Sequence, residues 1–167
     1  MPVADSSKLM LKNVHLLRDP GHFLALGAGS GLIPKAPGTA GTVVGVAIYW
    51  PLSALDQTVY LAVVAMLFVV GIPLCRRTAA KLGVHDHPGI VWDEIVGYLL
   101  TMAFTTASVA SCVIAFVAFR IFDIYKPWPI GVVDRSIGGG TGIMLDDVLA
   151  AIYAGLTLVF IEYLSYS

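Results

Sequence analysis

Charged residues are scarce in this sequence, since Asp, Glu, Lys and Arg make up 13% of its 167 residues, against about 25% in soluble proteins. Hydrophobic residues make up 57%, above the usual share of about 45–50%, which predicts a partly membrane-embedded chain. The net charge of −1 gives no basic surface for nucleic acid. We therefore expect membrane lipid as a partner, but neither nucleic acid nor an obligate protein partner.

Cysteine is also rare. Cys75 and Cys112 each lie inside an apolar run, without the spacing of a zinc site or a disulfide framework, so we expect two buried, reduced thiols. The first twenty residues contain cations but no continuous apolar core, so we expect no cleavable signal peptide.

Strand patterns are poor, and long charge-free runs separated by Gly and Pro favour helices. Residues 36–55, 57–75, 95–119 and 148–161 contain no charged residue and number 20, 19, 25 and 14. A membrane-spanning helix needs about 17–25 apolar residues. The first two runs can span, although a Pro/Gly-rich start shortens the helical part of the first, and the last is short for a span. We predict one all-α domain, a compact helical bundle that is partly membrane-embedded, with its polar loops on one face.

The acidic residues are concentrated in one part of the chain. Seven of the eleven fall between positions 86 and 147, where three cations leave a net charge of −4. They are Asp86, Asp93, Glu94, Asp123, Asp134, Asp146 and Asp147. Carboxylates are costly near hydrocarbon unless something pairs them. The cluster therefore predicts a bound cation, and oxygen ligands favour a hard divalent metal.

The run 95–119 decides whether these acids can meet. As one spanning helix, it would separate Asp93 and Glu94 from Asp123 across the membrane. Its centre carries a polar patch at 105–108, so we predict a helical hairpin that turns there and returns both ends to one face. The positive-inside rule places the cations that precede the acids on the cytoplasmic side, and two crossings by the first two runs then place the acids there too.

A Gly/Pro-rich loop places Gly38, Thr39 and Thr42 near a helix start, where N–H groups and hydroxyls suit a phosphate. The alternative is a capped helix in which Gly41 and Gly45 form a packing contact.

Asp93 and Glu94 open a charge-free helix, which suits either metal ligands or an ordinary acidic first turn. Just before them, His85 and His87 could be transition-metal ligands but lack a visible third partner. We expect both to be solvated loop histidines.

Arg120 and Asp123 are i,i+3 neighbours at a helix end, and Lys126 follows on the same face. They form either a helix-end salt bridge or a site in which Asp123 binds metal and the cations bind a substrate anion. A glycine-rich loop then leads to Asp146 and Asp147, which we expect at the start of the last helix. Several helices that each bring one or two carboxylates can assemble a metal site in a bundle.

From about His22 to near the C-terminus, the sequence resembles the phosphatidylglycerophosphatase A family. Four ordered motifs carry the resemblance: Gly-Ser-Gly-Leu with Pro-Gly-Thr-x-Gly-Thr at 29–42, Val-His-Asp-His with Ile-Val-Trp-Asp-Glu-x-Val-Gly at 84–97, Phe-Arg-x-Phe-Asp-Ile-x-Lys-Pro-Trp-Pro-Ile at 119–130, and Asp-Arg with Gly-Gly-x-Gly-Ile-Met-x-Asp-Asp at 134–147. We assign residues 21–167 to this domain and residues 1–20 to an N-terminal extension.

The resemblance implies a Mg²⁺-dependent phosphatase of the bacterial inner (cytoplasmic) membrane, with a central helix surrounded by others. Such an enzyme removes the terminal phosphate of phosphatidylglycerophosphate to give phosphatidylglycerol. Motifs typical of other phosphatases are missing, so metal-activated water is favoured over an Asp nucleophile, which stays open. The alternatives are a phosphatase for another lipid phosphate and a small cation-binding or transport membrane protein.

The candidate site residues fall into three groups. The metal ligands are Asp93, Glu94, Asp123, Asp146 and Asp147. The catalytic residues are Asp86, Asp134, Arg120 and Lys126. The residues that bind the substrate phosphate are Gly38, Thr39, Thr42 and Arg135.

Overall fold

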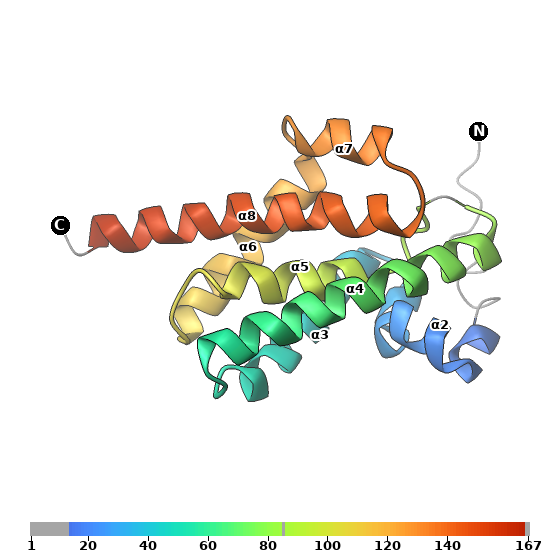
Figure 1. Ribbon diagram of the computed structural model, residues 1–167, viewed down its shortest axis with the longest axis horizontal. Coiled ribbons are helices and arrows are strands. Elements are labelled where there is room, and N and C mark those ends of the chain that lie inside the picture. Colours follow the sequence, from blue (N-terminus) through green and yellow to red (C-terminus); the bar gives the residue numbers. More distant parts are fainter. Residues whose placement is uncertain (1–13, 85, 166–167) are drawn as a thin grey trace.

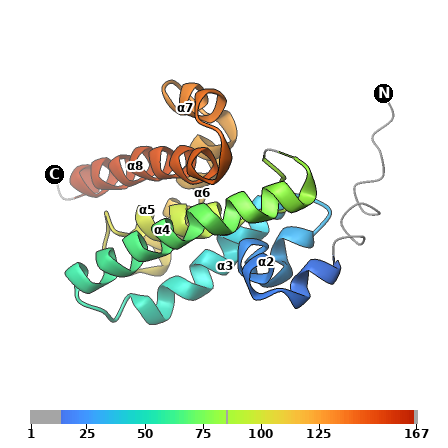
Figure 2. The same cartoon turned by 45° about the vertical axis from the view of Figure 1, so that its right-hand side comes forward.

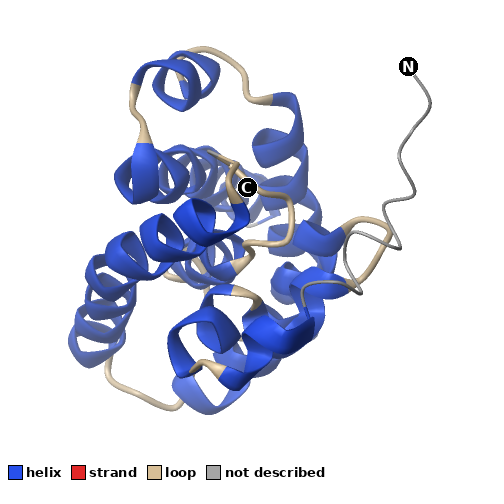
Figure 3. Cartoon of the chain, turned by 90° about the vertical axis from the view of Figure 1, so that its right-hand side faces the viewer, coloured by secondary structure: helices blue, strands red, loops and turns tan. Residues whose placement is uncertain are grey.

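The computed structural model describes residues 14–84 and 86–165, and every regular element within them is a helix (Figure 1). The elements are η1 (Val14–Arg18), α2 (Pro20–Ala25), η2 (Gly27–Leu32), α3 (Pro37–Leu52), α4 (Gln57–Leu82), α5 (Trp92–Met102), α6 (Val109–Tyr125), α7 (Ile130–Ser136) and α8 (Gly139–Ser165). The end-on view in Figure 3 shows these helices packed side by side, without a sheet. The all-α prediction is confirmed.

The central helix of the bundle is α5. Nine of its eleven residues are buried, and it packs against α3, α4, α6 and α8. Its contact with α3 depends on small residues, because a Cβ atom on Gly41 would lie 2.5 Å from Val91 Cβ and one on Gly45 would lie 3.3 Å from the Ile95 carbonyl oxygen. The glycine packing contact of the alternative interpretation is therefore present, with α5 as the partner, but Ala36 at the start of α3 makes no side-chain capping hydrogen bond.

The predicted hairpin is confirmed. Helix α5 ends at Met102 and α6 begins at Val109, where the Ser108 side chain caps it by accepting a hydrogen bond from the Ser111 N–H at 2.9 Å. The Gln57 side chain donates to the Ala103 carbonyl at 3.0 Å, which ties the turn to the start of α4. The N-terminus of α5 and the C-terminus of α6 consequently lie at the same end of the bundle.

Two of the described helices, α4 with 26 residues and α8 with 27, are long and apolar enough to span a membrane. The expectation for 57–75 is confirmed by α4. The expectation for 36–55 was wrong, because α3 has only 16 residues, fewer than the about 17–25 that a span needs. It starts at Pro37, after Ala36 in a left-handed conformation with φ of 51°.

The last helix is longer than its charge-free run indicated, and the expectation of a short helix was wrong. Asp146 and Asp147 lie two turns inside α8, and the glycine-rich segment before them is already helical rather than a loop. At the far end, the Thr105 hydroxyl donates to Glu162, so this acid is paired with the hairpin turn. The acids do not end the helix, because Asp146 and Asp147 are buried against neighbouring helices and Glu162 is paired with Thr105.

Both cysteines are buried and unbridged, as expected. One of them joins the two long helices, because Cys75 Sγ in the C-terminal half of α4 lies 3.8 Å from Met144 Sδ near the start of α8. The N-terminal extension stays a prediction, since residues 1–13 lie outside the described residues.

Candidate active site

Six of the seven clustered acids line one cleft of about 320 Å³, where α5 begins, α6 ends and the first turns of α8 pass. They are Asp86, Asp93, Glu94, Asp123, Asp146 and Asp147. The seventh, Asp134 on α7, accepts a hydrogen bond from Lys126, which lines the same cleft. The fold therefore brings together the acids that the sequence spreads over four helices and a loop.

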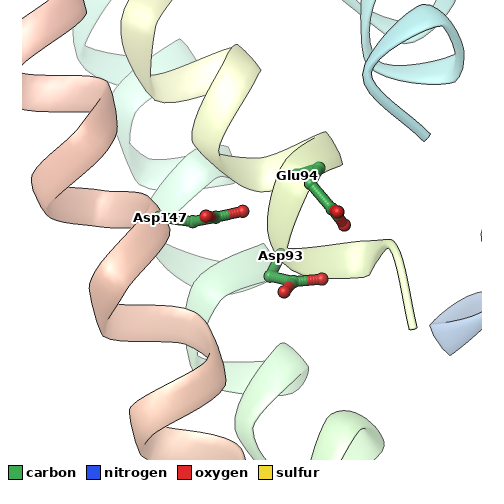
Figure 4. Close-up of side chains that lie close together, drawn as sticks. All are labelled: Asp93, Glu94 and Asp147. Carbon is green, nitrogen blue, oxygen red and sulfur yellow. The ribbon is translucent and has the colours of Figure 1, made fainter. Parts of the chain in front are cut away.

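Three of these acids are especially close. Asp93 and Glu94 project from the first turn of α5 and Asp147 from α8 (Figure 4). One ligand oxygen from each lies within 4.8 Å of the other two. The positive end of the α5 dipole favours acids at this place, but its partial charge is too small to offset three carboxylates.

Several carboxylate oxygens in this group have no partner. Asp93 Oδ1, Glu94 Oε2 and Asp147 Oδ2 are buried without a hydrogen bond in the described part of the chain, and so is Asp146 Oδ1. Buried polar atoms in folded proteins are nearly always hydrogen-bonded, so such oxygens need an explanation. A bound cation would supply the missing partner for these oxygens.

Burial, reinforced by neighbouring carboxylate charge, raises the pKa of Asp93 and that of Glu94 well above the ordinary range. A cation between the carboxylates would keep them ionised at neutral pH. The donor set of Asp93, Glu94 and Asp147 consists only of oxygen, which fits a hard divalent cation. The cluster can therefore bind a metal.

Two cations border the acids. Arg120 donates to Asp123 through Nη1, which also lies 3.7 Å from Glu94 Oε1. The Nζ of Lys126 lies 2.8 Å from Asp134 Oδ1 and 2.5 Å from Asp146 Oδ2. Asp123 and Asp146 therefore each pair with a cation and do not belong to the close group of Asp93, Glu94 and Asp147. Their role as metal ligands stays a prediction.

Lys126 is held in this position by the backbone. It follows the last residue of α6 in a left-handed conformation with φ of 43°, which turns the chain toward α7. Burial alone would lower the pKa of its ammonium group, but the hydrogen bonds from Lys126 to Asp134 and Asp146 raise the pKa above its usual range. Lys126 is therefore positively charged at any physiological pH.

Of the four residues predicted to bind phosphate, Gly38 is the one that lines the cleft within the described residues. A Cβ atom on Gly38 would lie 2.2 Å from Glu94 Oε1, so the missing side chain provides room beside the acids. The Thr42 hydroxyl donates to the Gly38 carbonyl at 2.9 Å and is buried within α3. Thr39 and Arg135 do not line the cleft, and their assignment stays a prediction.

One expectation about the histidines was wrong. His87 is buried rather than solvated, and its Nδ1 accepts a hydrogen bond from the Gly89 N–H at 3.0 Å. His85 lies outside the described residues. The cleft also has an apolar lining that includes Pro88, Ile90 and Ile124. The sequence does not predict it, because single apolar residues are not distinctive in so hydrophobic a chain.

The family profile described as Phosphatidylglycerophosphatase A matches residues 23–162 of this chain. The chain belongs to the phosphatidylglycerophosphatase A family. Its resemblance to the family is thereby confirmed, and so is the prediction that it is an enzyme of the phosphatase class.

Curated relatives agree with this assignment. A phosphatidylglycerophosphatase A from Haemophilus influenzae is 48% identical over 158 residues, which cover 92% of this chain and 94% of the relative. One from Escherichia coli K12 is 40% identical over 164 residues, covering 98% and 95%. A relative from Bacteroides thetaiotaomicron, provisionally named a phosphatidylinositol-3-phosphatase, is 36% identical over 141 residues, covering 79% and 87%. No solved structure matches the chain.

Proposed function

We propose that this member of the phosphatidylglycerophosphatase A family hydrolyses the terminal phosphomonoester of phosphatidylglycerophosphate to phosphatidylglycerol and phosphate. The names of the relatives from Haemophilus influenzae and Escherichia coli support this substrate. The observation that carries the proposal is the buried group of Asp93, Glu94 and Asp147, whose unpaired oxygens lie beside the cations Arg120 and Lys126.

Mg²⁺ is the proposed cofactor, held by Asp93, Glu94 and Asp147, with Asp123 and Asp146 as further proposed ligands. When bound, it would neutralise phosphoryl charge and lower the pKa of the attacking water. The all-oxygen donor set supports this metal.

The cations of the chain would bind the substrate phosphate. Arg120 Nε is buried without a partner in the described structure, so it can donate to a phosphoryl oxygen while Nη1 stays on Asp123. Lys126 would contribute a second charge, oriented by Asp134 and Asp146. Asp86, exposed at the mouth of the cleft, is proposed to exchange protons with solvent during the reaction.

The cytoplasmic face of the inner membrane is the proposed location of the cleft. The positively charged residues Arg76, Arg77 and Lys81 occupy the last turns of α4, and Cys75 in the same region contacts Met144, next to the acids of α8. The cleft therefore lies at the end of the bundle that the positive-inside rule assigns to the cytoplasm.

An apolar groove supports a lipid substrate. It has a volume of about 380 Å³, lies between α6 and α8, and includes Val113, Val117 and Ile121. These residues recur at intervals of four along α6, and Ile124, one further turn along the same face, lines the catalytic cleft. An acyl chain lying in the groove would bring its headgroup to the acids.

Filling the groove is expected to affect long-chain substrates selectively. Val117→Trp should raise KM for a long-chain lipid phosphate about tenfold, as expected from the loss of 1–2 kcal/mol of apolar contact, and leave a short-chain analogue unaffected. Val117 is 51% exposed, so the fold should tolerate the change. The matched control is Val69→Trp on α4, an exposed position that does not line the groove. Equal KM values for wild type and Val117→Trp would exclude the groove from substrate binding.

A substrate panel tests the proposed function itself. Purified full-length protein should release phosphate from phosphatidylglycerophosphate faster than from phosphatidic acid or phosphatidylinositol 3-phosphate. Faster release from one of the other two lipids would show that the protein is a phosphatase with a different preferred substrate. Ion flux through liposomes with no release from any lipid phosphate would support the transport alternative instead.

A further inference from the structure

A second large pocket lies outside the catalytic cleft. It has a volume of about 680 Å³ and is bordered by η1, the start of α2 and the last turns of α4. Figure 2 shows α2 lying beside the C-terminal half of α4, away from α8. Its polar lining consists of His15, Arg18, Asp19, His22, Arg77 and Lys81, and none of its lining residues belongs to the catalytic cleft.

The pocket carries an excess of positive charge. Asp19 is the one carboxylate among the described lining residues, and it accepts hydrogen bonds from the Arg77 guanidinium at 2.7 Å and from the Gly21 N–H at 2.9 Å. Arg18 and Lys81 have no carboxylate partner in the part of the chain that the structure describes. Two cations without internal partners, facing one pocket, favour an anionic ligand.

The inner wall of the pocket contains a buried, hydrogen-bonded histidine. His22 is only 5% exposed, and its Nδ1 shares a hydrogen bond of 2.9 Å with Oγ1 of the fully buried Thr78. This bond joins α2 to α4 and leaves Nε2 as the ring nitrogen that can reach a ligand. Burial disfavours the charged form of the imidazole and lowers its pKa, so His22 contributes a hydrogen-bonding group more than a charge.

The surroundings favour a lipid over a soluble anion. Val14, Phe23 and Leu24, which neighbour lining residues of the pocket, are 47%, 40% and 40% exposed. Helix α4 is one of the two candidate spans, and the pocket is formed by its last turns. Basic residues at the cytoplasmic end of a span lie at the depth of anionic lipid headgroups.

We propose that this pocket binds the phosphodiester headgroup of an anionic phospholipid from the surrounding bilayer, with Arg18 and Lys81 as the charged contacts. The exposed side chains of Phe23 and Leu24 contact its acyl chains. The bound lipid is not hydrolysed, because Asp19 is the one carboxylate among the described lining residues and the cluster of three carboxylates with unpaired oxygens lies in the cleft. The site therefore holds the enzyme against an anionic membrane surface, independently of its substrate.

Binding of fluorescently labelled phosphatidylserine to the full-length protein in an uncharged detergent tests this proposal. Unlabelled phosphatidylserine should compete, whereas phosphatidylcholine with the same chains and glycerophosphoserine without chains should compete at least tenfold less well. The variant Arg18→Gln/Lys81→Gln should bind the probe about 30-fold more weakly, at about 1 kcal/mol for each charge.

Two further variants make the result decisive. Lys35→Gln/Arg76→Gln removes the same charge from exposed positions outside the pocket and should bind like wild type. Arg18→Lys/Lys81→Arg keeps the charge and should also bind like wild type, which covers the case in which the Gln variant does not fold. The Gln variant should retain phosphate release in detergent.

Three outcomes would overturn the proposal. If the Gln variant and its charge-matched control bind the probe equally weakly, overall charge and not the pocket determines binding. Unchanged binding by the Gln variant would exclude the pocket. Glycerophosphoserine competing as well as phosphatidylserine would make this a site for soluble phosphate esters. None of these outcomes depends on the phosphatase reaction, so the proposed function stands or fails separately.

Discussion

Replacing Asp93 or Asp147 with Asn should reduce phosphate release by at least about 100-fold, because changes in the outer shell of metal sites already reduce metal affinity or activity by about 10–100-fold. Asn keeps the shape of the side chain but removes the charge that a divalent cation needs. Both residues are buried in the close carboxylate group. The measurement is the rate of phosphate release at increasing Mg²⁺ concentration.

These variants should also separate metal binding from folding. Three buried carboxylates repel one another when no cation is present, so Asp93→Asn and Asp147→Asn should unfold at the same or a higher temperature than wild type in EDTA. Glu162→Gln is the matched control: this acid lies at the far end of α8, paired with Thr105, and its loss should leave the rate unchanged. Full activity of both Asn variants would contradict the metal assignment.

Replacing Lys126 with Met should lower both stability and activity. Lys126 bridges Asp134 and Asp146, and the side chain of Asp146 is only 6% exposed. Removing one partner of a buried pair leaves the other charge uncompensated, which destabilises by about 3–5 kcal/mol in buried cases. Because Lys126 itself is 25% exposed, we expect a loss of about 2–3 kcal/mol in the free energy of unfolding, with a lower rate of phosphate release.

A double variant tests whether the stability is lost because Asp146 is left as an unpaired buried charge. Lys126→Met/Asp146→Asn removes both partners and should recover most of the lost stability while phosphate release stays low. Denaturant unfolding in detergent gives the stability, and the rate is measured on the same samples. If the double variant is no more stable than Lys126→Met, the ion pair does not stabilise this end of the bundle.

Local patterns in the sequence predicted the parts of the site that depend on neighbouring residues. The polar patch at 105–108 predicted the hairpin, and the acids after Trp92 predicted the start of α5. The i,i+3 spacing of Arg120 and Asp123 predicted their contact. In each case, the interaction joins residues within one helix or one turn.

Contacts over longer distances were not visible in the sequence. Lys126 reaches Asp146, twenty residues later, only because the backbone turns at Lys126 and α7 returns the chain to α8. The charge-free run 148–161 underestimates α8, because the helix continues past its acids. Asp146 and Asp147 face the cleft at one end, and Glu162 pairs with Thr105 at the other. The charge-free runs therefore predicted a possible span at 36–55, where α3 is too short, and underestimated the length of α8, which is a candidate span.

The sequence also does not show which acids lie together and which pair with cations. Sequence reasoning grouped five acids as metal ligands, yet the close group contains Asp93, Glu94 and Asp147, while Asp123 and Asp146 lie beside cations. The direction of a carboxylate depends on rotation about its helix and on the partner that reaches it. Neither is fixed by the order of residues.

Titration of the EDTA-treated, full-length protein with Mg²⁺ tests the central claim most directly, with phosphate release from phosphatidylglycerophosphate and the heat of binding measured together. The account predicts no release without metal, recovery as Mg²⁺ is added, and neither binding nor recovery in Asp93→Asn/Asp147→Asn. Release at the full rate in EDTA, or Mg²⁺ binding that the double variant leaves intact, would contradict it.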